Sequence, residues 1–358
     1  MQHRQPEHEH ADGGERAAGP RTGRAAGRPE PRDALNDRDE RCEDADPAHG
    51  VQRSKWRHVP WLVLLAAVLA GTAHAADPGK SGATDAGGEL TVGLAALLGI
   101  IQGATEFLPV SSSGHLALAQ RLFGIDAEAA GHRFNIAAHA GTLLAVVWVY
   151  RLQIKELAAV LLAPHRDSEQ RRWVLAIIVA TLPLGIGLAP GFEDAIVAIE
   201  QRPRLIGVAL LVTAAILFLA FRKARPVPDP PSSEPPTLRQ AIGIGLAQLV
   251  AVVPGVSRSG STIAAGGLVG LDRERAARFS FLISIPAILG ATLLEVRKVV
   301  GTDAPSIDPL PYAVGFGTSL LVGFACLRWL LAIIRGGNLN AFVVYLLVVG
   351  VLAIVVMG

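Results

Sequence analysis

Long apolar runs separated by short polar stretches dominate the chain from about residue 89 onward. A run of roughly 20 apolar residues is long enough to cross the hydrocarbon core of a bilayer as an α-helix. The pattern therefore predicts an all-α polytopic membrane protein with six transmembrane helices. The expected spans are 134–150, 173–190, 205–221, 277–296, 312–334 and 340–357.

Two further apolar segments are interrupted by polar residues. In the first, the apolar stretches 90–101 and 116–123 flank Gln102–His115, and the second covers 241–270. Half-length helices joined by a Ser/Gly turn are typical of re-entrant helical hairpins, which a membrane tolerates where protein or a water-filled cavity surrounds them. We expect one such hairpin in each segment.

The two interrupted segments also resemble each other. Gln102 and Gln248 open them, and both carry Val-Ser-x-Ser-Gly near the end, at 110–114 and 256–260. Three predicted spans separate the copies, and an odd number of spans inverts the second copy relative to the membrane. We therefore expect an inverted-topology repeat, about 89–221 and 238–358, whose two hairpins meet near the midplane.

The segment that precedes the apolar core has a different composition. Residues 1–54 are rich in Arg, Glu, Asp, Gly and Pro, which predicts a disordered polar leader that is not translated natively if synthesis starts near Val51. Residues 55–76 combine basic, apolar and small residues, as a signal peptide does, with an N-terminal membrane segment as the alternative. A linker, 77–88, leads to the membrane domain, 89–358.

Composition and charge limit the possible functions. The 358 residues are 51% hydrophobic and 18% charged with a net charge of +2, so no basic surface for nucleic acid is expected. Two distant cysteines, Cys42 and Cys326, exclude a disulfide framework and a cysteine metal site. Basic residues gather in the loops 151–172, 222–239 and 273–278, which predicts that these loops are cytoplasmic.

The second interrupted segment has the residues of an anion site. Arg258 lies among small residues at the start of an apolar helix, where its planar fork of donors suits phosphate oxygens. Ser/Gly turns and a helix N-terminus add backbone donors. A nucleotide-hydrolase P-loop is excluded because Ser261 replaces the required lysine.

The first interrupted segment has the residues of a nucleophilic site. Glu106 is a candidate base or metal ligand, the run Ser111–Ser113 offers nucleophiles or donors, and His115 titrates near neutral pH. Each of these side chains also has a purely structural interpretation. A charge at the bilayer centre costs about 2.5–3.5 kcal/mol, however, so an acid, a histidine and an arginine together favour a function.

The polar stretches of the two interrupted segments resemble the motifs of a known family. QGATEFLPVSSSGH is similar to the EGxTEFLPVSSxGH motif, and PGVSRSGST to the PGxSRSxxT motif, of the undecaprenyl-diphosphate phosphatases, the bacitracin-resistance family of bacterial inner membranes. The resemblance covers the chain from about residue 90 to the end. It implies hydrolysis of undecaprenyl diphosphate to the monophosphate carrier of cell-wall synthesis, a divalent cation such as Mg²⁺ or Ca²⁺, an active site open to the periplasm, and a homodimer.

The resemblance also implies roles for individual residues. It places the catalytic positions on Glu106, Ser112, His115 and Arg258, and it allows either a serine or the histidine as the nucleophile. We favour Ser112, activated by Glu106 or His115. The expected substrate-binding residues are Gln102, Ser111, Ser113, Gly255, Ser257, Ser259 and Thr262. The family's first glutamate is Gln102 here, so the expected metal ligands, Glu106 and Gln102, include only one carboxylate.

Two other classes of function remain open at the level of sequence. Inverted repeats that meet at the midplane are also a transporter architecture, so a carrier or flippase for an anionic polyprenyl lipid is the alternative. A transporter needs no nucleophile, and release of phosphate would discriminate the two. A purely structural scaffold leaves the intramembrane Glu106 and Arg258 unexplained.

Overall fold

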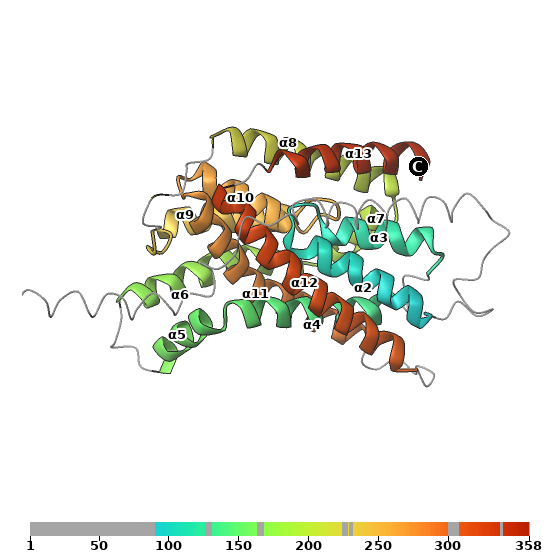
Figure 1. Cartoon of the computed structure of the whole chain (residues 1–358), viewed down its shortest axis with the longest axis horizontal. Helices are drawn as coiled ribbons and strands as arrows, with labels where there is room; N and C mark the ends of the chain where they lie inside the picture. Colours follow the sequence, from blue (N-terminus) through green and yellow to red (C-terminus); the bar gives the residue numbers. More distant parts are fainter. Residues whose placement is uncertain are drawn as a thin grey trace, which may run out of the picture. The chain divides into compact units, whose positions relative to one another are not determined.

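The computed structural model describes residues 90–125, 131–162, 168–223, 228, 232–299, 308–336 and 339–357. The regular structure of this part of the chain is helical, as predicted (Figure 1). The predicted leader, signal-like segment and linker, at 1–54, 55–76 and 77–88, lie outside the described residues and stay predictions.

The helices follow one another along the chain in two series. The first comprises α2 (Val92–Phe107), α3 (Ser112–Leu122), α4 (His132–Val149), α5 (Arg151–Leu162), α6 (Ser168–Thr181), the 3₁₀ helix η3 (Leu182–Leu188), α7 (Phe192–Glu200) and α8 (Pro203–Lys223). The second comprises α9 (Leu238–Val250), α10 (Arg258–Leu268), α11 (Arg273–Val299), α12 (Leu310–Gly336) and α13 (Asn340–Val356).

Four stretches of the described residues are long and apolar enough to cross a membrane: Glu169–Leu188, Pro203–Arg222, Arg273–Arg297 and Leu310–Arg335. They coincide with four of the six predicted spans, and the chain is a helical membrane protein. The other two predicted spans are also helices, α4 with 18 residues and α13 with 17. At 1.5 Å per residue, a 17-residue helix is about 25 Å long, slightly less than the hydrocarbon core.

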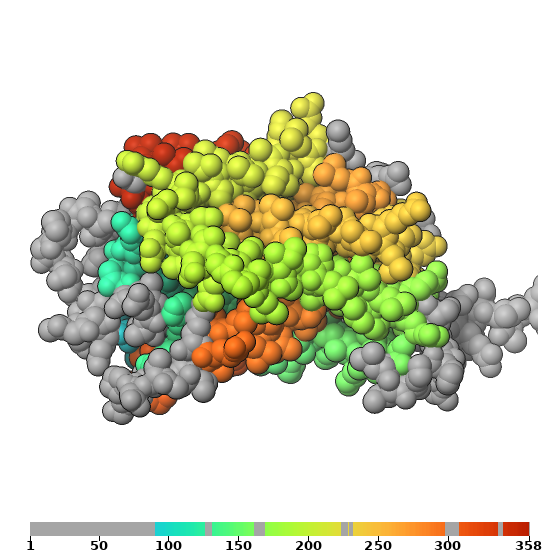
Figure 2. All heavy atoms as spheres, turned by 180° about the vertical axis from the view of Figure 1, so that it is seen from behind, coloured from blue at the N-terminus to red at the C-terminus, as the bar shows by residue number. Residues whose placement is uncertain are grey.

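Large apolar side chains on the outside of the bundle fit a surrounding bilayer. On the face shown in Figure 2, α6 and η3 run beside α9. Leu182, Leu188, Leu246 and Val250 on these elements are all more than half exposed. An apolar surface of this kind is unfavourable in water and favourable against lipid tails.

The first interrupted segment forms a helical hairpin whose turn is shorter than predicted. The polar pattern predicts a turn over the whole stretch between the two half-helices, but α2 continues to Phe107 and α3 already begins at Ser112. Pro109 explains where α2 ends, because the residue before a proline is driven to an extended conformation, as Leu108 is with φ −64° and ψ 145°. Gln102 and Glu106 therefore lie on a helix, one turn apart.

The two hairpins make matching contacts. α2 packs against α12, and α9 packs against α6. The glycine three residues before each motif glutamine permits the close approach. A Cβ on Gly99 would lie 2.6 Å from the carbonyl oxygen of Gly315 in α12, and one on Gly245 would lie 2.7 Å from that of Ala180 in α6. The sequence resemblance between the segments is thus matched by their packing, and α8 pairs with α13 beside them (Figure 1).

Candidate active site

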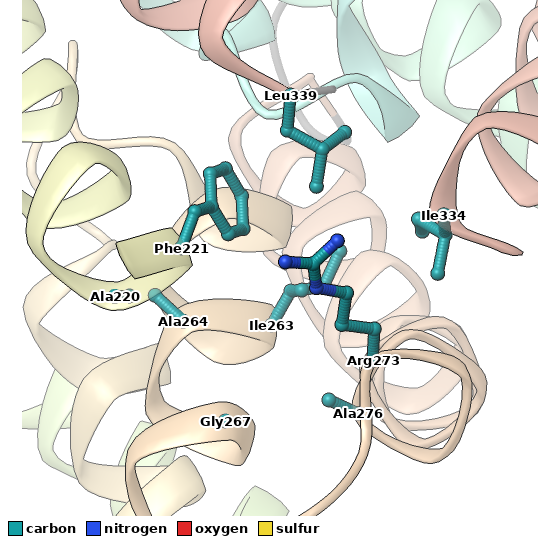
Figure 3. A pocket seen from close by; sticks show the side chains of 9 residues that line it. All are labelled: Ala220, Phe221, Ile263, Ala264, Gly267, Arg273, Ala276, Ile334 and Leu339. Carbon is teal, nitrogen blue, oxygen red and sulfur yellow. The ribbon is translucent and has the colours of Figure 1, made fainter. Parts of the chain in front are cut away.

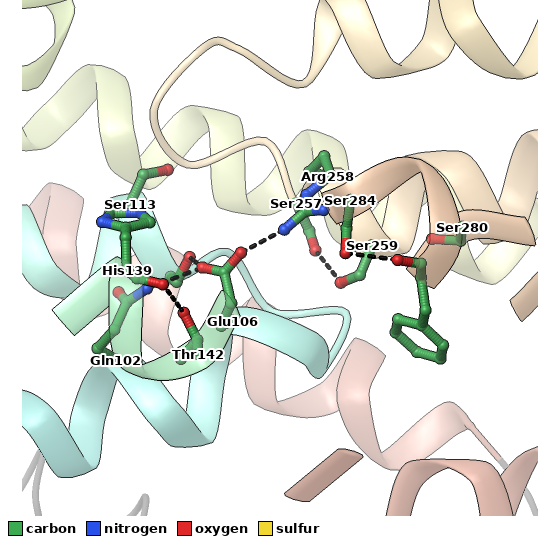
Figure 4. Close-up of polar contacts among 12 residues, drawn as sticks. Gln102, Glu106, Ser113, His139, Thr142, Ser257, Arg258, Ser259, Ser280 and Ser284 are labelled. Carbon is green, nitrogen blue, oxygen red and sulfur yellow. Dashed lines mark hydrogen bonds and ion pairs between the residues drawn. The ribbon is translucent and has the colours of Figure 1, made fainter. Parts of the chain in front are cut away.

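The turns of the two hairpins are in contact. The Ser259 hydroxyl donates to the carbonyl oxygen of Leu108 at 3.0 Å, which ties the second turn to the first. A Cβ on Gly114 would come within 3.0 Å of the Gly255 Cα, so no side chain separates the two backbones. Residues 151 positions apart in the sequence therefore share one site, as the repeat predicted (Figure 4).

The Val-Ser-x-Ser-Gly motif folds in the same way in both copies. Ser111 caps α3 by accepting from the Gly114 N–H at 3.3 Å, and Ser257 caps α10 by accepting from the Gly260 N–H at 3.1 Å. In each copy the hydroxyl of the cap serine also contacts that of the serine two residues later, at 3.4 Å for Ser111–Ser113 and 3.2 Å for Ser257–Ser259. The variable residue of the motif is thereby the first residue of its helix: Ser112 in one copy and Arg258 in the other.

Glu106 lies between these two residues, and its side chain is almost fully buried. Its Oε2 accepts from the Ser112 hydroxyl at 2.5 Å and from the Gln102 amide at 2.9 Å. Its Oε1 forms an ion pair with Arg258, whose side chain is 17% exposed (Figure 4). The carboxylate is thus held by one cation and two hydrogen-bond donors, which is the compensation that a buried charge requires.

His115 lies apart from this carboxylate. Its Nδ1 is 2.8 Å from the carbonyl oxygen of Ser111, and its Nε2 is 2.8 Å from the Tyr345 hydroxyl. The two rings also stack, with centroids 5.5 Å apart and an interplanar angle of 10°. Both ring nitrogens are therefore occupied in a network that joins α3 to α13. Tyr345 was not identified from the sequence.

The backbone at both motif turns is unusual. Ser111 has φ 73°, the one positive φ of a non-glycine residue in the described part of the chain, and such a conformation persists only where its surroundings fix it. In the second turn, Gly255 takes the positive φ, at 96°. Thr213 of α8 holds this turn, donating to the Gly255 carbonyl oxygen at 3.0 Å and accepting from the Ser257 N–H at 3.1 Å.

The expected substrate-binding residues differ in their accessibility. Ser111, Ser257 and Ser259 are buried and engaged in the caps and the contact between turns. Thr262 is buried between α10 and α11, where its hydroxyl lies 2.6 Å from that of Ser280. Ser113 is exposed, and Ser112 and Arg258 are partly exposed. Among the expected catalytic and substrate-binding residues named in this paragraph, these three have side chains that a substrate can reach.

His139 of α4 is a further residue beside the site, and it lies outside both sequence motifs. It lies close enough to Glu106 for an electrostatic interaction between the two side chains (Figure 4). Its Nδ1 is 2.8 Å from the carbonyl oxygen of Asn135, one turn earlier in the helix. The feature of the sequence that could have indicated it is a titratable residue within the predicted transmembrane span 134–150, three residues before Thr142.

The donors around Glu106 allow a test of whether a divalent cation fits. No group of three or more His, Cys, Asp or Glu side chains is arranged for metal binding within the described ranges. The Gln102 Oε1 atom, however, is buried and has no hydrogen-bond partner. Mg²⁺ is commonly held by one or two carboxylates together with water and substrate phosphates. Gln102 and Glu106 are therefore the two residues that would hold such an ion, with its remaining ligands coming from the substrate.

A separate hollow lies away from this carboxylate. Arg273 extends into it between apolar side chains, and its Nε has no hydrogen-bond partner (Figure 3). Ala220, Phe221, Ile263, Ala264, Gly267, Ala276, Ile334 and Leu339 form the rest of the lining. None of the predicted site residues takes part in it.

Comparison with known proteins gives consistent matches. The family model described as bacitracin resistance protein BacA matches residues 95–352. An undecaprenyl-diphosphatase of Desulfatibacillum aliphaticivorans is 41% identical over 273 residues, which cover 72% of this chain and 96% of the relative. Undecaprenyl-diphosphatases of Bacteroides fragilis strain YCH46 and Oceanobacillus iheyensis are 40% and 37% identical, over 97% and 94% of their lengths and 73% and 72% of this chain.

Proposed function

The chain belongs to the bacitracin resistance protein BacA family of undecaprenyl-diphosphatases, and we propose that it cleaves its substrate where Ser112, Glu106 and Arg258 meet. The family membership expected from the two motifs is confirmed, and with it the enzyme class. The products are undecaprenyl phosphate, the lipid carrier of cell-wall synthesis, and inorganic phosphate. The observation that carries the proposed site is the Ser112 hydroxyl, 2.5 Å from a buried carboxylate.

Ser112 is the proposed nucleophile, and Glu106 its base. In the first step the Ser112 Oγ attacks the terminal phosphorus, its proton passes to Glu106 Oε2, and the anhydride bond breaks with its electron pair on the departing undecaprenyl phosphate. In the second step water attacks the same phosphorus, and the Ser112 Oγ leaves and recovers a proton from Glu106. The short hydrogen bond supports this assignment, because a base must be within hydrogen-bond reach of the proton that it takes.

Arg258 is proposed to stabilise the transferring phosphoryl group. Its guanidinium has five N–H donors, so it can keep Glu106 ionised with one of them and bind phosphoryl oxygens with others. The N-termini of α3 and α10, which meet at the contact between the turns, add a favourable field for the anion. Charge stabilisation of this kind is the main contribution to catalysis of phosphoryl transfer.

A divalent cation, Mg²⁺ or Ca²⁺, is proposed to bind at Glu106 and the free Gln102 Oε1. When bound together with the diphosphate, it would neutralise part of the substrate's charge. Gln102 can offer its amide oxygen to the ion but cannot act as a base. Among the residues selected for the proposed site, Glu106 therefore supplies the only carboxylate.

The membrane arrangement is proposed to be six spans and two re-entrant hairpins in an inverted-topology repeat. The shared motif geometry and the matching glycine contacts of α2 and α9 support it. The positive-inside rule supports cytoplasmic loops at 151–172, 222–239 and 273–278. A site open to the periplasm, location in the bacterial inner membrane and a homodimer are proposed from the resemblance to the family.

Phosphate release from undecaprenyl diphosphate by the purified full chain tests the proposed site. We expect turnover in the wild type and a large loss in Ser112→Ala and Arg258→Gln. Ser233→Ala and Arg239→Gln, which change exposed side chains outside the site, serve as matched controls and keep wild-type turnover. Wild-type rates in both site variants would refute the site, and a wild type that moves the lipid without releasing phosphate would favour a carrier.

A further inference from the structure

Two histidines flank the proposed site. Their hydrogen bonds leave the Nε2 atom occupied in one ring and available in the other. In both, Nδ1 lies 2.8 Å from a backbone carbonyl oxygen, that of Ser111 for His115 and that of Asn135 for His139. A carbonyl oxygen can only accept, so Nδ1 carries the proton in each ring. The nitrogen left to act as a base in the neutral ring is therefore Nε2.

The Nε2 of His115 is already occupied. It accepts from the Tyr345 hydroxyl at 2.8 Å, and the ring is 5% exposed and stacked on Tyr345. His139 is partly exposed, and its Nε2 has no hydrogen-bond partner among the described residues. Of the two histidines, His139 is the one with an available basic nitrogen.

The packing of α4 fixes the place of His139. The neighbouring Ala138 accepts through its carbonyl oxygen from Ser319 of α12 at 2.9 Å, and a Cβ on Gly141 would clash with the carbonyl oxygen of Phe316 at 2.5 Å. α4 also packs against α2 and α11. His139 thus occupies a helix held on several sides. Its ring lies beside Ser113 in Figure 4, close enough to Glu106 for an electrostatic interaction.

The proposed reaction leaves a task for such a group. After the first step Glu106 holds the proton of Ser112, so it cannot also accept one from the attacking water. A second carboxylate is lacking because Gln102 stands where the resemblance expects glutamate. Glu106 therefore cannot activate the water, and general-base catalysis of the second step requires another group.

We propose that His139 is a catalytic residue, the general base of the second step. This inference rests on the proposed function. The water oxygen forms a bond to phosphorus while one of its protons passes to His139 Nε2. The bond between phosphorus and the Ser112 Oγ breaks, and the Ser112 Oγ takes the proton that Glu106 holds. Phosphate leaves, and the proton on His139 returns to solvent.

Trapping of the phosphorylated enzyme tests this assignment. The purified full chain is mixed with undecaprenyl diphosphate labelled in its terminal phosphate and quenched in acid. We expect His139→Ala and His139→Gln to retain the label on Ser112 while steady-state phosphate release falls about 100-fold, the lower end of what a general base contributes. Added imidazole should restore turnover in His139→Ala and not in Ser112→Ala.

The matched control is His132→Gln, which changes a histidine in the first turn of the same helix and outside the site. It should keep wild-type turnover. Wild-type turnover in both His139 variants would overturn the inference. So would loss of turnover in both with neither trapped label nor rescue by imidazole. Phosphate release by the wild type in the same experiment tests the proposed function separately.

Discussion

Ser112 and Arg258 contact opposite oxygens of one carboxylate, that of Glu106. Each is the first residue of its helix and fills the variable position of Val-Ser-x-Ser-Gly. The same backbone turn, formed twice, thus delivers a hydroxyl from one copy and a cation from the other to a single acid. The two copies differ in chemistry at the position where their geometry is the same.

The ion pair between Glu106 and Arg258 should stabilise the folded chain. Glu106→Gln and Arg258→Gln should each lower the free energy of unfolding by about 3 kcal/mol, because each leaves the partner without its charge in a buried site. The double variant should lose less than the sum. A double-mutant cycle in detergent, followed by denaturant titration, measures the difference.

The pair Glu274–Arg335 provides the control for that cycle. Its nitrogen–oxygen distance is 2.9 Å, with the Arg335 side chain 42% exposed and that of Glu274 10% exposed. We expect a smaller coupling energy there, because solvent screens the charge of the exposed Arg335. Equal coupling energies in the two cycles would show that Glu106 is not a buried charge compensated by Arg258.

Tyr345 is expected to position His115. Tyr345→Phe removes the hydroxyl that bonds His115 Nε2 and keeps the stacked ring, so stability should fall by about 1 kcal/mol. Turnover should fall less than tenfold, since His115 bonds Ser111 and Tyr345 rather than Glu106. Thermal unfolding and phosphate release of the same preparations report the two effects. A loss of turnover as large as that in Ser112→Ala would instead indicate that His115 takes part in the chemistry.

Gln102→Glu should change metal binding. The substitution adds a second carboxylate one helical turn from Glu106, and affinity for divalent cations rises with the number of charged ligands. Calorimetric titration with Mg²⁺ or Ca²⁺ should show about tenfold tighter binding. Gln201→Glu, in an exposed turn, should leave affinity at the wild-type value. Unchanged affinity in Gln102→Glu would argue against a cation at this position.

Close packing between α2 and α12 should depend on Gly99. Gly99→Val should destabilise the chain by about 1–3 kcal/mol, because a Cβ there would lie 2.6 Å from the carbonyl oxygen of Gly315. Gly93 lies in the same helix, and a Cβ there would meet no atom within 4 Å, so Gly93→Val isolates the effect of β-branching. Thermal unfolding in detergent compares the two variants, and equal losses of stability would contradict the tight contact.

The sequence predicted the parts of the site that lie within the two motifs. Glu106, Ser112 and Arg258 were selected because charged and nucleophilic residues interrupted apolar runs, and the repeated motif predicted that the two segments would meet. The boundary of α2 was predicted too early, because a polar stretch was interpreted as a turn. Pro109, rather than polarity, determines where that helix ends.

His139 and Tyr345 could not be placed from the sequence. In both spans the apolar residues are spread around the helix and not confined to one side, so the pattern of residues does not indicate which face of each helix points inward. Their contacts depend on how α4 and α13 pack against distant segments of the chain. Thr213 is similar, since its two bonds to the second turn join residues more than 40 positions apart.

The most direct test of the proposed site is to identify the residue that carries phosphate during turnover. Undecaprenyl diphosphate labelled in its terminal phosphate is mixed with the purified chain, and the quenched protein is digested and sequenced by mass spectrometry. We expect acid-stable label on Ser112 that is absent from Ser112→Ala. Label on His115, or phosphate release by Ser112→Ala at the wild-type rate, would contradict the assignment of Ser112 as the nucleophile.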